Sequence, residues 1–424
     1  MMDKKKKELI LLCNKFPFGF GEAFLEAEFP YLYQSFEKIT IVSNTDSKEL
    51  TRTVDNDVVV LRKPRTKSTA EVLKTICYLL VHLKTFVSLV YQEIKACKYI
   101  TSRFDDTTKS NRYRLLIPIF HDAFRAFNLK MFLETNVLNH AAESAVLYAY
   151  WQDYTALALA LIKYKSSSYK AICRAHRVDL YFDASKYNYL TFRSYISDHL
   201  DKVVFISEDG LQYQSRCLNK KYNNYIVSRL GTEKIEESDN KNKNNTFLLV
   251  SCSTLTPVKR VDLIINALAM IAEIDIQWIH FGDGKLKNKL LLQAKERLDG
   301  KANISYTFKG NVSNTEIHKF YANTQVNCFI NVSESEGIPV SIMEAMSYGI
   351  PVIATDVGGT RELVDNDCGV LAEPDITEVE LAKIILKEFN SNLIYQKGSK
   401  AKLNWQKKFS AHVNYKYFIN DLHV

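Results

Sequence analysis

The sequence predicts an α/β protein made of two domains, each built around a parallel β-sheet. Short apolar runs of strand length alternate with longer segments of helical periodicity, an order typical of parallel strands joined by helices. An almost wholly polar stretch, residues 233–246, divides the chain into two such series and is predicted to be a linker. With 424 residues the chain is long enough for two or three domains with full cores.

The first domain is predicted to occupy residues 1–232. Its first helix is expected at residues 23–33, and its strands at residues 9–13, 38–43, 57–61, 145–150, 170–175 and 202–207, the last of which closes the domain. Lys4–Lys7 followed by Leu9–Cys13 imitates a signal peptide, but the apolar run is too short and no small-residue cleavage site follows. We therefore expect Leu9–Cys13 to be the first strand.

Residues 70–140 are predicted to be a helical insertion in this domain. Polar residues recur at helical spacing over 70–96, and residues 112–133 repeat the pattern with phenylalanines among basic side chains. Two interpretations remain open. The helices pack on the sheet and on each other, which we favour for most of this surface, or they rest on an anionic bilayer. No stretch approaches the roughly 18 uninterrupted apolar residues of a transmembrane helix.

The composition narrows the class of protein. Apolar residues make up 46% of the chain and charged residues 25%, which is ordinary for a globular protein. The net charge of +8 fits an anionic substrate or an anionic membrane surface, and no nucleic-acid recognition motif accompanies it. The eight cysteines have no paired spacing, which argues against a zinc site or a disulfide framework. We expect a protein of a reducing compartment, the cytoplasm.

Two loops of the first domain carry candidate functional residues. Gly19 and Gly21 lie between the first strand and the first helix, the usual mouth of a Rossmann-like half. His176 follows the strand at 170–175, with Asp179 three residues later, and parallel-sheet enzymes place their sites at such strand ends. The alternatives are a tight turn for the glycines and a structural role for the histidine.

The second domain is predicted over residues 247–404. Its strands are expected at residues 247–251, 276–281, 304–309, 326–332 and 352–354, and its helices at 261–272, 339–348 and 380–397. A further helix is expected at 405–422. Asp55–Asp57 and Asp365–Asp367 are Asp-x-Asp triplets of the kind that hold a divalent metal, but we interpret both as turns.

The stretch Ser335–Gly349 is the most informative part of the chain. Pro339 suits the first position of a helix, and Gly349 suits the position just past its end. The helix N-terminus, around 337–341, offers free backbone N–H groups and a partial positive charge to a phosphate or diphosphate. Glu344 lies about 7–8 Å further along the axis, and Glu336 precedes the helix. A phosphate centre with hydroxyls on both sides predicts a nucleotide sugar as ligand.

The same stretch resembles the glutamate-x-seven-glutamate signature of the retaining family-4 glycosyltransferases, the glycosyl transferases group 1. Asp356–Val364 resembles the continuation of that signature. The resemblance is strong over 247–372, moderate over 10–30 and 170–207, and poor over 60–140. The alternative is a buried helix whose glutamates cap and solubilise it.

The resemblance implies the GT-B architecture, two Rossmann-like domains that face each other across a cleft, with a last helix, 405–424, that returns to the first domain. It implies catalytic roles for Glu336 and His176, and a position near the donor phosphates and the acceptor for Gly19 and Gly21. Asp179 would lie on the acceptor side. The donor-binding residues implied are Lys259, Arg260, Gly337, Ile338, Pro339, Val340, Glu344, Gly282, Gly310 and Asn311.

One departure from the family pattern stands out. The family has an arginine early and a lysine late in the turn that corresponds to 253–260. Lys259 matches the lysine, whereas Thr254 replaces the arginine and Arg260 stands where glycine is common. A fixed guanidinium fork is thereby lost from the diphosphate site, unless Arg260 substitutes for it.

The implied function is transfer of a sugar, with retention of anomeric configuration, from a nucleotide sugar to a glycan or lipid-linked acceptor in bacterial surface-polysaccharide biosynthesis (O-antigen, capsule or exopolysaccharide). No cofactor and no metal are expected. The expected location is the cytoplasm, with peripheral contact to the anionic inner face of the cell membrane. The alternatives are a glycogen-synthase-like or sugar-phosphate synthase of the same architecture, or a non-catalytic sugar-nucleotide-binding protein.

Overall fold

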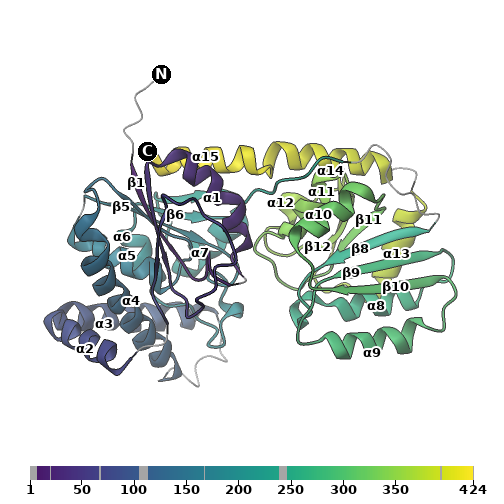
Figure 1. Cartoon of the computed structure of the whole chain (residues 1–424). Helices are drawn as coiled ribbons and strands as arrows, with labels where there is room; N and C mark the ends of the chain where they lie inside the picture. Colours follow the sequence, from purple (N-terminus) through teal and green to yellow (C-terminus); the bar gives the residue numbers. More distant parts are fainter. Residues whose placement is uncertain are drawn as a thin grey trace. The chain divides into compact units, whose positions relative to one another are not determined.

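The computed structural model describes residues 7–19, 21–65, 68–104, 113–166, 168–237, 246–391 and 394–423. The chain divides into two compact units. Unit 1 comprises residues 1–228 and 416–424, and unit 2 comprises residues 229–415. Each unit has one parallel sheet with helices against it (Figure 1). The predicted pair of parallel-sheet α/β domains is confirmed.

Unit 1 contains a seven-stranded sheet in the order β3-β2-β1-β4-β5-β6-β7. Its strands are β1 Glu8–Cys13, β2 Lys38–Ser43, β3 Val59–Arg62, β4 Val146–Ala149, β5 Lys170–Ala175, β6 Lys202–Phe205 and β7 Tyr225–Val227. Every pair is parallel. The sequence prediction ended this sheet at β6 and was wrong there, because β7 has only three residues and no periodicity of its own.

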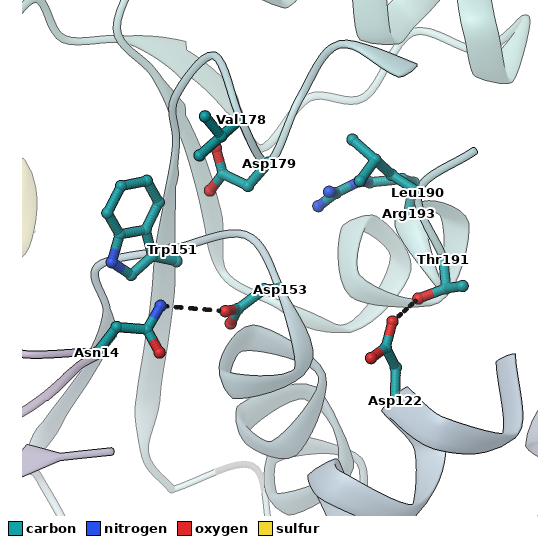
Figure 2. Close-up of a pocket in the computed structure, with 9 residues that line it drawn as sticks. All are labelled: Asn14, Asp122, Trp151, Asp153, Val178, Asp179, Leu190, Thr191 and Arg193. Carbon is teal, nitrogen blue, oxygen red and sulfur yellow. Dashed lines mark hydrogen bonds between the residues drawn. The ribbon is translucent and has the colours of Figure 1, made fainter. Parts of the chain in front are cut away.

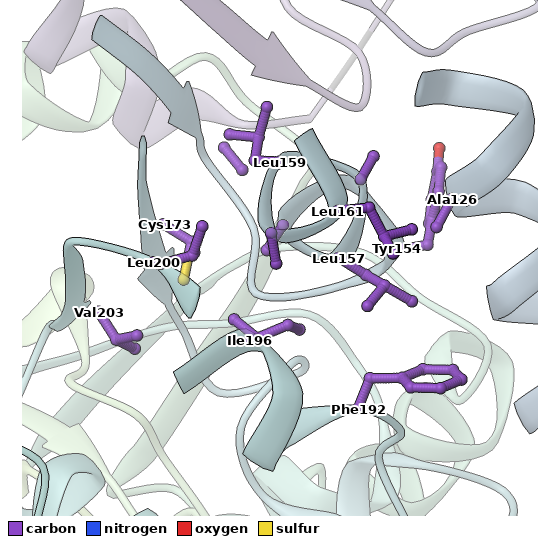
Figure 3. Close-up of a cluster of buried hydrophobic side chains, with 14 of the residues drawn as sticks. Ala126, Tyr154, Leu157, Leu159, Leu161, Cys173, Phe192, Ile196, Leu200 and Val203 are labelled. Carbon is purple, nitrogen blue, oxygen red and sulfur yellow. The ribbon is translucent and has the colours of Figure 1, made fainter. Parts of the chain in front are cut away.

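Both faces of the unit 1 sheet are covered. Leu9 and Leu11 of β1 belong to one buried cluster, and Ile10 and Leu12 to another, because successive side chains of a strand point to opposite faces. The helices of unit 1 outside the insertion are α1 Ala23–Ser35, α5 Tyr154–Lys165, α6 Arg193–His199, α7 Glu208–Leu218 and the end of α15. Figure 3 shows the second cluster, in which α5 contributes Leu157 and Leu161.

The helical insertion consists of three helices, α2 Thr69–Val81, α3 Leu83–Phe104 and α4 Leu116–Asn136. The prediction of one continuous helix over 70–96 was wrong, because the chain leaves helical geometry at His82 and α3 sets off at 88° to α2. Arg112, the predicted start of the second helical region, lies outside the described residues. No single described helix is long and apolar enough to cross a membrane, although α2 with Leu83–Ile100 meets the length and composition criteria as a bent pair.

Unit 2 contains a six-stranded sheet in the order β10-β9-β8-β11-β12-β13. Its strands are β8 Phe247–Cys252, β9 Ile276–Phe281, β10 Ile304–Gly310, β11 Cys328–Asn331, β12 Val352–Thr355 and β13 Gly369–Ala372. Its helices are α8 Val261–Ala269, α9 Lys287–Leu298, α10 Asn314–Asn323, α11 Val340–Ser347, α12 Thr360–Leu363, α13 Glu378–Phe389 and α14 Ile394–Lys408. Trp278, with no exposed surface, is the largest side chain of its core.

The C-terminal helices differ from the prediction. The sequence predicted two helices, at 380–397 and 405–422. The structure has three in this region, α13, α14 and α15 Ala411–His423, because the helix expected to start at Trp405 is interrupted at Phe409 and Ser410. The last part of α15, from Lys416, belongs to unit 1, where Phe418 packs on Tyr148 with 5.4 Å between ring centroids.

The boundary between the units also differs from the predicted linker. Unit 2 begins at Arg229, and the backbone N–H of Ile235 donates to the Tyr348 hydroxyl of the same unit at 3.0 Å. The predicted linker therefore starts inside unit 2, where polar residues form hydrogen bonds with the domain. Residues 238–245 of that linker lie outside the described residues, as do residues 1–6 of the signal-like segment.

A buried ion pair ties α1 to the sheet of unit 1 and generates a stability prediction. Arg174 on β5 and Glu28 on α1 have no exposed surface, and the Arg174 guanidinium donates to the Glu28 carboxylate. Burial raises the pKa of Glu28. Replacing Arg174→Met leaves a buried carboxylate without its partner, so we expect a loss of about 3–5 kcal/mol in the free energy of unfolding, measured by urea denaturation.

Two controls test that assignment. The double variant Glu28→Leu/Arg174→Met removes both charges and is expected to recover most of the loss. Lys220→Met breaks an exposed pair with Asp198 and is expected to cost about 1 kcal/mol or less. Equal losses in Arg174→Met and Lys220→Met would show that burial of the pair is unimportant.

Candidate functional site

The site of unit 2 lies where the chain crosses from one half of the sheet to the other. β8 pairs with β9 on one side and with β11 on the other, so the connections that leave β8 and β11 run in opposite directions. Ligands of open α/β sheets bind at such a switch point, beyond the carboxyl ends of the strands. The loops after β8 and β11 carry Lys259 and Glu336, respectively.

Lys259 and Glu336 join these two loops by an ion pair. The Lys259 ammonium lies 2.6 Å from the Glu336 carboxylate, which is almost wholly buried. The side-chain amide of Asn331, the last residue of β11, donates to the same carboxylate oxygen at 3.3 Å. Since the ammonium has three donors, Lys259 can hold Glu336 and bind an anion at the same time.

Arg260 braces the loop that follows β11. Its Nε donates to the Val332 carbonyl at 2.7 Å, and its Nη2 is buried without a partner in the described part of the chain. Burial lowers the pKa of the guanidinium. Its φ of 44° lies in the left-handed region, which explains why glycine suits this position. Arg260 thus supports the loop of Glu336, whereas Thr254 is exposed.

The start of α11 presents unpaired backbone donors. Pro339 has extended backbone angles and is the N-cap residue of α11. The helix therefore starts at Val340, one residue later than predicted. Among the described residues, the N–H groups of Gly337, Ile338, Val340 and Ser341 meet no acceptor. The unpaired donors that the sequence predicts at this helix end are therefore present, and their binding of an anion stays a prediction.

A glycine holds the backbone of this loop from the other side. A Cβ on Gly358, after β12, would lie 1.9 Å from the carbonyl oxygen of Glu336. The N–H of Gly359 donates to the Gly337 carbonyl at 2.8 Å. The approach of these two loops requires glycine and fixes the backbone that carries Glu336.

Glu344 is a buried carboxylate on α11. It accepts a hydrogen bond of 2.6 Å from the side-chain amide of Asn314, at the start of α10. Burial raises its pKa to about 7, against the smaller lowering effect of Asn314. A hydrogen bond from a further donor would stabilise the charged form of this carboxyl group, as the bond from Asn314 does.

The loops after β9 and β10 complete the same edge of the sheet. Gly282 has a φ of 135°, and a Cβ there would lie 1.8 Å from the Ser253 carbonyl oxygen of the β8 loop. Its N–H donates to Gly310 at 2.8 Å. Gly310 has a φ of 72°, and Asn311 after it is exposed. Unit 2 therefore brings all its predicted donor-side residues to one edge of one sheet.

Unit 1 repeats the arrangement, with β1 and β4 adjacent at its own switch point. The glycine loop after β1 is held by Glu22, whose carboxylate accepts the backbone N–H groups of residues 14–16 at 2.7 Å each. The indole N–H of Trp151, after β4, also donates to Glu22. The Gly19 carbonyl accepts the Thr51 hydroxyl at 2.5 Å. Gly19 and Gly21 both have positive φ.

His176 lies at the carboxyl end of β5, as the sequence placed it. Its ring packs against Tyr150 and Trp151, with centroids 4.8 and 4.6 Å away. Both of its ring nitrogens are buried without a hydrogen-bond partner among the described residues. Aromatic packing therefore fixes the ring, and its Nδ1 lies 3.9 Å from the Asp179 carboxylate.

Asp179 holds two loops together. One carboxylate oxygen accepts the backbone N–H of Gln152, and the other accepts that of His176, both at 2.6 Å. The Asp179 carboxylate thus positions His176 through the backbone.

A pocket of about 230 Å³ opens beside these residues in unit 1 (Figure 2). It is lined from the loops after β1, β4 and β5, from α4, and from the segment that leads into α6. Asp153, at the start of α5, and the buried Arg193, on α6, face this space with Asp179.

Sequence reasoning missed several of these residues. Asn331, Asn314 and Gly358 act on the predicted glutamates from other elements. Asp122 on α4 lies far from the pocket loops in sequence, and no local pattern links it to them. Trp151 and Asp153 had a signal, since they directly follow a strand that neighbours β1. Within the described residues, no group of three His, Cys, Asp or Glu side chains is arranged to hold a metal ion, and Asp365–Asp367 forms a turn.

Two parallel-sheet α/β units of this kind are the architecture of the GT-B class of proteins. Residues 232–404 match the model of the family described as "Glycosyl transferases group 1", and this domain belongs to that family.

Among solved structures, that of Anabaena HepE in complex with UDP-glucose is similar, with a TM-score of 0.65 and 17% identity over 98% of this chain and 99% of that chain. The uncharacterized glycosyltransferase MJ1178 of Methanocaldococcus jannaschii is 29% identical over 223 residues, 51% of this chain and 59% of that protein.

A poly(ribitol-phosphate) alpha-N-acetylglucosaminyltransferase of Staphylococcus aureus is 27% identical over 168 residues, 37% of this chain and 31% of the relative. The matches to the first curated relatives span about half of the relatives' length. The structural similarity shows the fold, and the family match is specific to the second domain.

The raised pKa of Glu344 generates a test. Between the ordinary pKa of a glutamate, about 4.3, and the folded value of about 7, the folded protein binds a proton that the unfolded chain releases. Stability should therefore fall as pH rises through this window, by about 3 kcal/mol from this group alone. Glu344→Gln is neutral throughout and is expected to gain in melting temperature over wild type at pH 8 but not at pH 4.

Calorimetric melting of both proteins at the two pH values measures this difference. Glu296→Gln, on the exposed face of α9, is the control and is expected to follow wild type. A Glu344→Gln variant whose melting temperature keeps a constant offset from wild type would contradict the assignment of a protonated Glu344.

Proposed function

We propose that this protein transfers a sugar from a nucleoside diphosphate sugar to a hydroxyl group of a glycan or lipid-linked acceptor, with retention of anomeric configuration. The observation that carries the proposal is Lys259 beside Glu336 and the unpaired N–H groups of 337–341, in a glycosyl transferases group 1 domain. The HepE structure with UDP-glucose and the named activity of the S. aureus relative support it.

Departure of the nucleoside diphosphate is the step that the unit 2 site would assist. Negative charge develops on the leaving diphosphate, and preorganised donors aimed at it lower the barrier. The Lys259 ammonium and the N–H groups at the start of α11 supply such donors without the rearrangement that free water would need. In this proposal they stabilise the leaving group without a metal, and Arg260 keeps the loop in place.

The two glutamates have different roles in the proposal. Glu344, about five residues into the helix, accepts hydrogen bonds from the ribose hydroxyls. Glu336, held by Lys259 and Asn331, accepts hydrogen bonds from the transferred sugar. His176 of unit 1 contacts the reacting sugar or the acceptor through its ring nitrogens, which have no hydrogen-bond partner among the described residues, while Asp179 holds its backbone.

The donor site is tested by calorimetric titration with UDP. A hydrogen bond to a charged group contributes about 1.5–3 kcal/mol, so Lys259→Met is expected to lower UDP affinity ten- to hundredfold. Lys383→Met, on an exposed position of α13, is the matched control and should bind like wild type.

His176→Ala should keep UDP affinity and lose transfer, measured as UDP release from a panel of UDP-sugars with glycan acceptors.

The outcomes separate the proposal from its alternatives. UDP binding that is unaffected by Lys259→Met would remove the proposed donor site. Tight binding of UDP-sugars with no transfer to any glycan, lipid-linked or sugar-phosphate acceptor would instead favour a non-catalytic binding protein.

The proposal includes peripheral attachment to the anionic inner face of a bacterial cell membrane. Apolar side chains are exposed around the bend between α2 and α3, and we call them the elbow patch: Leu73, Ile76, Leu80, Val81, Leu83, Val87 and Tyr91. Val81, at the bend, is 79% exposed. Lys74, Lys84, Lys95 and Lys98 are exposed on the same two helices, whereas Glu93 is buried.

This charge distribution fits anionic headgroups, and the patch is continuous along each helix. Leu73, Ile76 and Leu80 share one face of α2, and Leu83, Val87 and Tyr91 share one face of α3. A neighbouring stripe of α3 packs into the core through Leu89, Val90 and Cys97. An amphipathic surface of this kind lies in the membrane interface, and it would bring the protein to an acceptor that cannot leave the bilayer.

Vesicle sedimentation tests the attachment. Each lysine near an anionic surface contributes about 1 kcal/mol, and salt screens this contribution. The protein should pellet with phosphatidylglycerol vesicles at low salt, release at high salt, and bind phosphatidylcholine vesicles poorly. Leu80→Asp/Val81→Asp should abolish pelleting, whereas Leu292→Asp, at a 57% exposed position of α9, should not. A different outcome would identify the patch as an interface between copies: wild type binds no vesicles but self-associates in lipid-free solution, and Leu80→Asp/Val81→Asp abolishes that self-association.

A further inference from the structure

The pocket of unit 1 has an unusual balance of charge. Three carboxyl groups line it, those of Asp122, Asp153 and Asp179, and a single guanidinium, that of Arg193. Two more guanidinium groups lie nearby but outside this lining: that of Arg125, 3.5 Å from the centre of the Tyr154 ring, and that of Arg65, which donates to the Asn14 carbonyl at 3.5 Å. Among the lining side chains themselves, carboxyl groups outnumber the guanidinium three to one, so the lining disfavours an anionic ligand.

The three carboxyl groups are not equivalent. Both oxygens of Asp179 are occupied by backbone N–H groups. One oxygen of Asp153 is held by Thr155, whereas the other meets only the Asn14 amide at 3.4 Å. One oxygen of Asp122 accepts the Thr191 hydroxyl at 2.8 Å, and the other lies 3.2 Å from the ring Nδ1 of His121. Asp153 therefore keeps the least occupied oxygen, and each Asp122 oxygen, with one partner, can accept a second hydrogen bond from a ligand.

Buried polar atoms at the pocket are left without protein partners. The Nε of Arg193, whose side chain is 4% exposed, has no hydrogen-bond partner among the described residues, and neither has the amide oxygen of Asn14. The side-chain amide of Gln152, next to Trp151, is fully buried and is unpaired at both ends. Native proteins rarely leave such groups unpaired, so this corner is built for a polar ligand or for the water that precedes it.

The walls limit the size and shape of that ligand. The Trp151 indole, fixed by its bond to Glu22, forms one wall, and Val178 and Leu190 add apolar surface. A volume of about 230 Å³ is below the range of about 300–1,000 Å³ for sites of drug-sized ligands. One ring with hydroxyl groups on its edges and an apolar face fits these walls.

We propose that this pocket is a monosaccharide subsite that accepts an uncharged sugar ring and rejects rings that carry a phosphate or a carboxylate. Asp153 and Asp122 accept hydrogen bonds from ring hydroxyls, Arg193 and Asn14 supply the remaining polar contacts, and Trp151 covers an apolar face of the ring. The inference rests on the proposed function, because it assigns the uncharged ring to the acceptor of the transfer.

Saturation-transfer NMR on the full chain tests the subsite. The probes are the methyl glycosides of glucose, galactose, mannose and N-acetylglucosamine, and the methyl glycosides of glucuronic and galacturonic acid. At least one uncharged glycoside should bind tenfold or more tightly than either uronic acid. Asp153→Asn/Asp122→Asn should reduce that preference at least fivefold, because it removes the charges that repel a carboxylate. Asp198→Asn, at an exposed position of unit 1, is the control and should keep the preference.

Each contrary outcome has a distinct meaning. Binding of a uronic acid as tight as that of the best uncharged glycoside, or no binding of any glycoside, overturns the subsite. An unchanged preference in Asp153→Asn/Asp122→Asn overturns it as well. Calorimetric titration of the same variants with UDP reports on unit 2, so a failure of the proposed donor site appears as lost UDP binding in wild type while the glycoside preference persists.

Discussion

Parallel pairing of the first strand of each sheet with the fourth is the constraint on which both sites depend. β8 lies between β9 and β11, and β1 lies between β2 and β4. Because parallel strands end at the same edge, loops far apart in sequence meet there. Lys259 and Glu336 are 77 residues apart along the chain and form an ion pair, and Asn14 reaches Asp153 over 139 residues. Without this pairing, neither set of side chains would converge.

Carboxylates hold the resulting loops, and they do so largely by accepting backbone N–H groups. Glu22 accepts three backbone N–H groups of the loop after β1, and Asp179 joins the loops after β4 and β5. Irregular loops leave backbone donors that must be satisfied when they are buried. A carboxylate satisfies several donors at once, which explains acidic residues at positions where no reaction is assigned to them.

Donors that are left unsatisfied mark the opposite case. The N–H groups at the start of α11 and the ring nitrogens of His176 are surrounded by well-packed structure and yet have no partner among the described residues. In unit 2 these donors accompany an ammonium, whereas in unit 1 the pocket is predominantly acidic. The two units thus offer different environments, with unpaired N–H groups beside an ammonium in unit 2 and three carboxyl groups beside one guanidinium in the unit 1 pocket.

The sequence by itself determined the two parallel-sheet domains and most of the strands, because strand-length apolar runs and turn residues are local signals. β2, β5 and β9 begin and end where the pattern placed them. The stretch 335–349 also determined its own local structure, since Pro339 marks the start of the helix and Gly349 follows its end. Only the start of the helix is shifted, by one residue.

Only the tertiary structure decided which side chains meet. Asn314 reaches Glu344 and Asp122 joins the unit 1 pocket through contacts between distant elements, and no spacing in the sequence encodes those distances. The bend at His82 and the short strand β7 also depend on tertiary contacts, because their own residues carry no distinctive periodicity. Local propensity specifies elements, whereas burial and long-range hydrogen bonds specify how these elements assemble into a site.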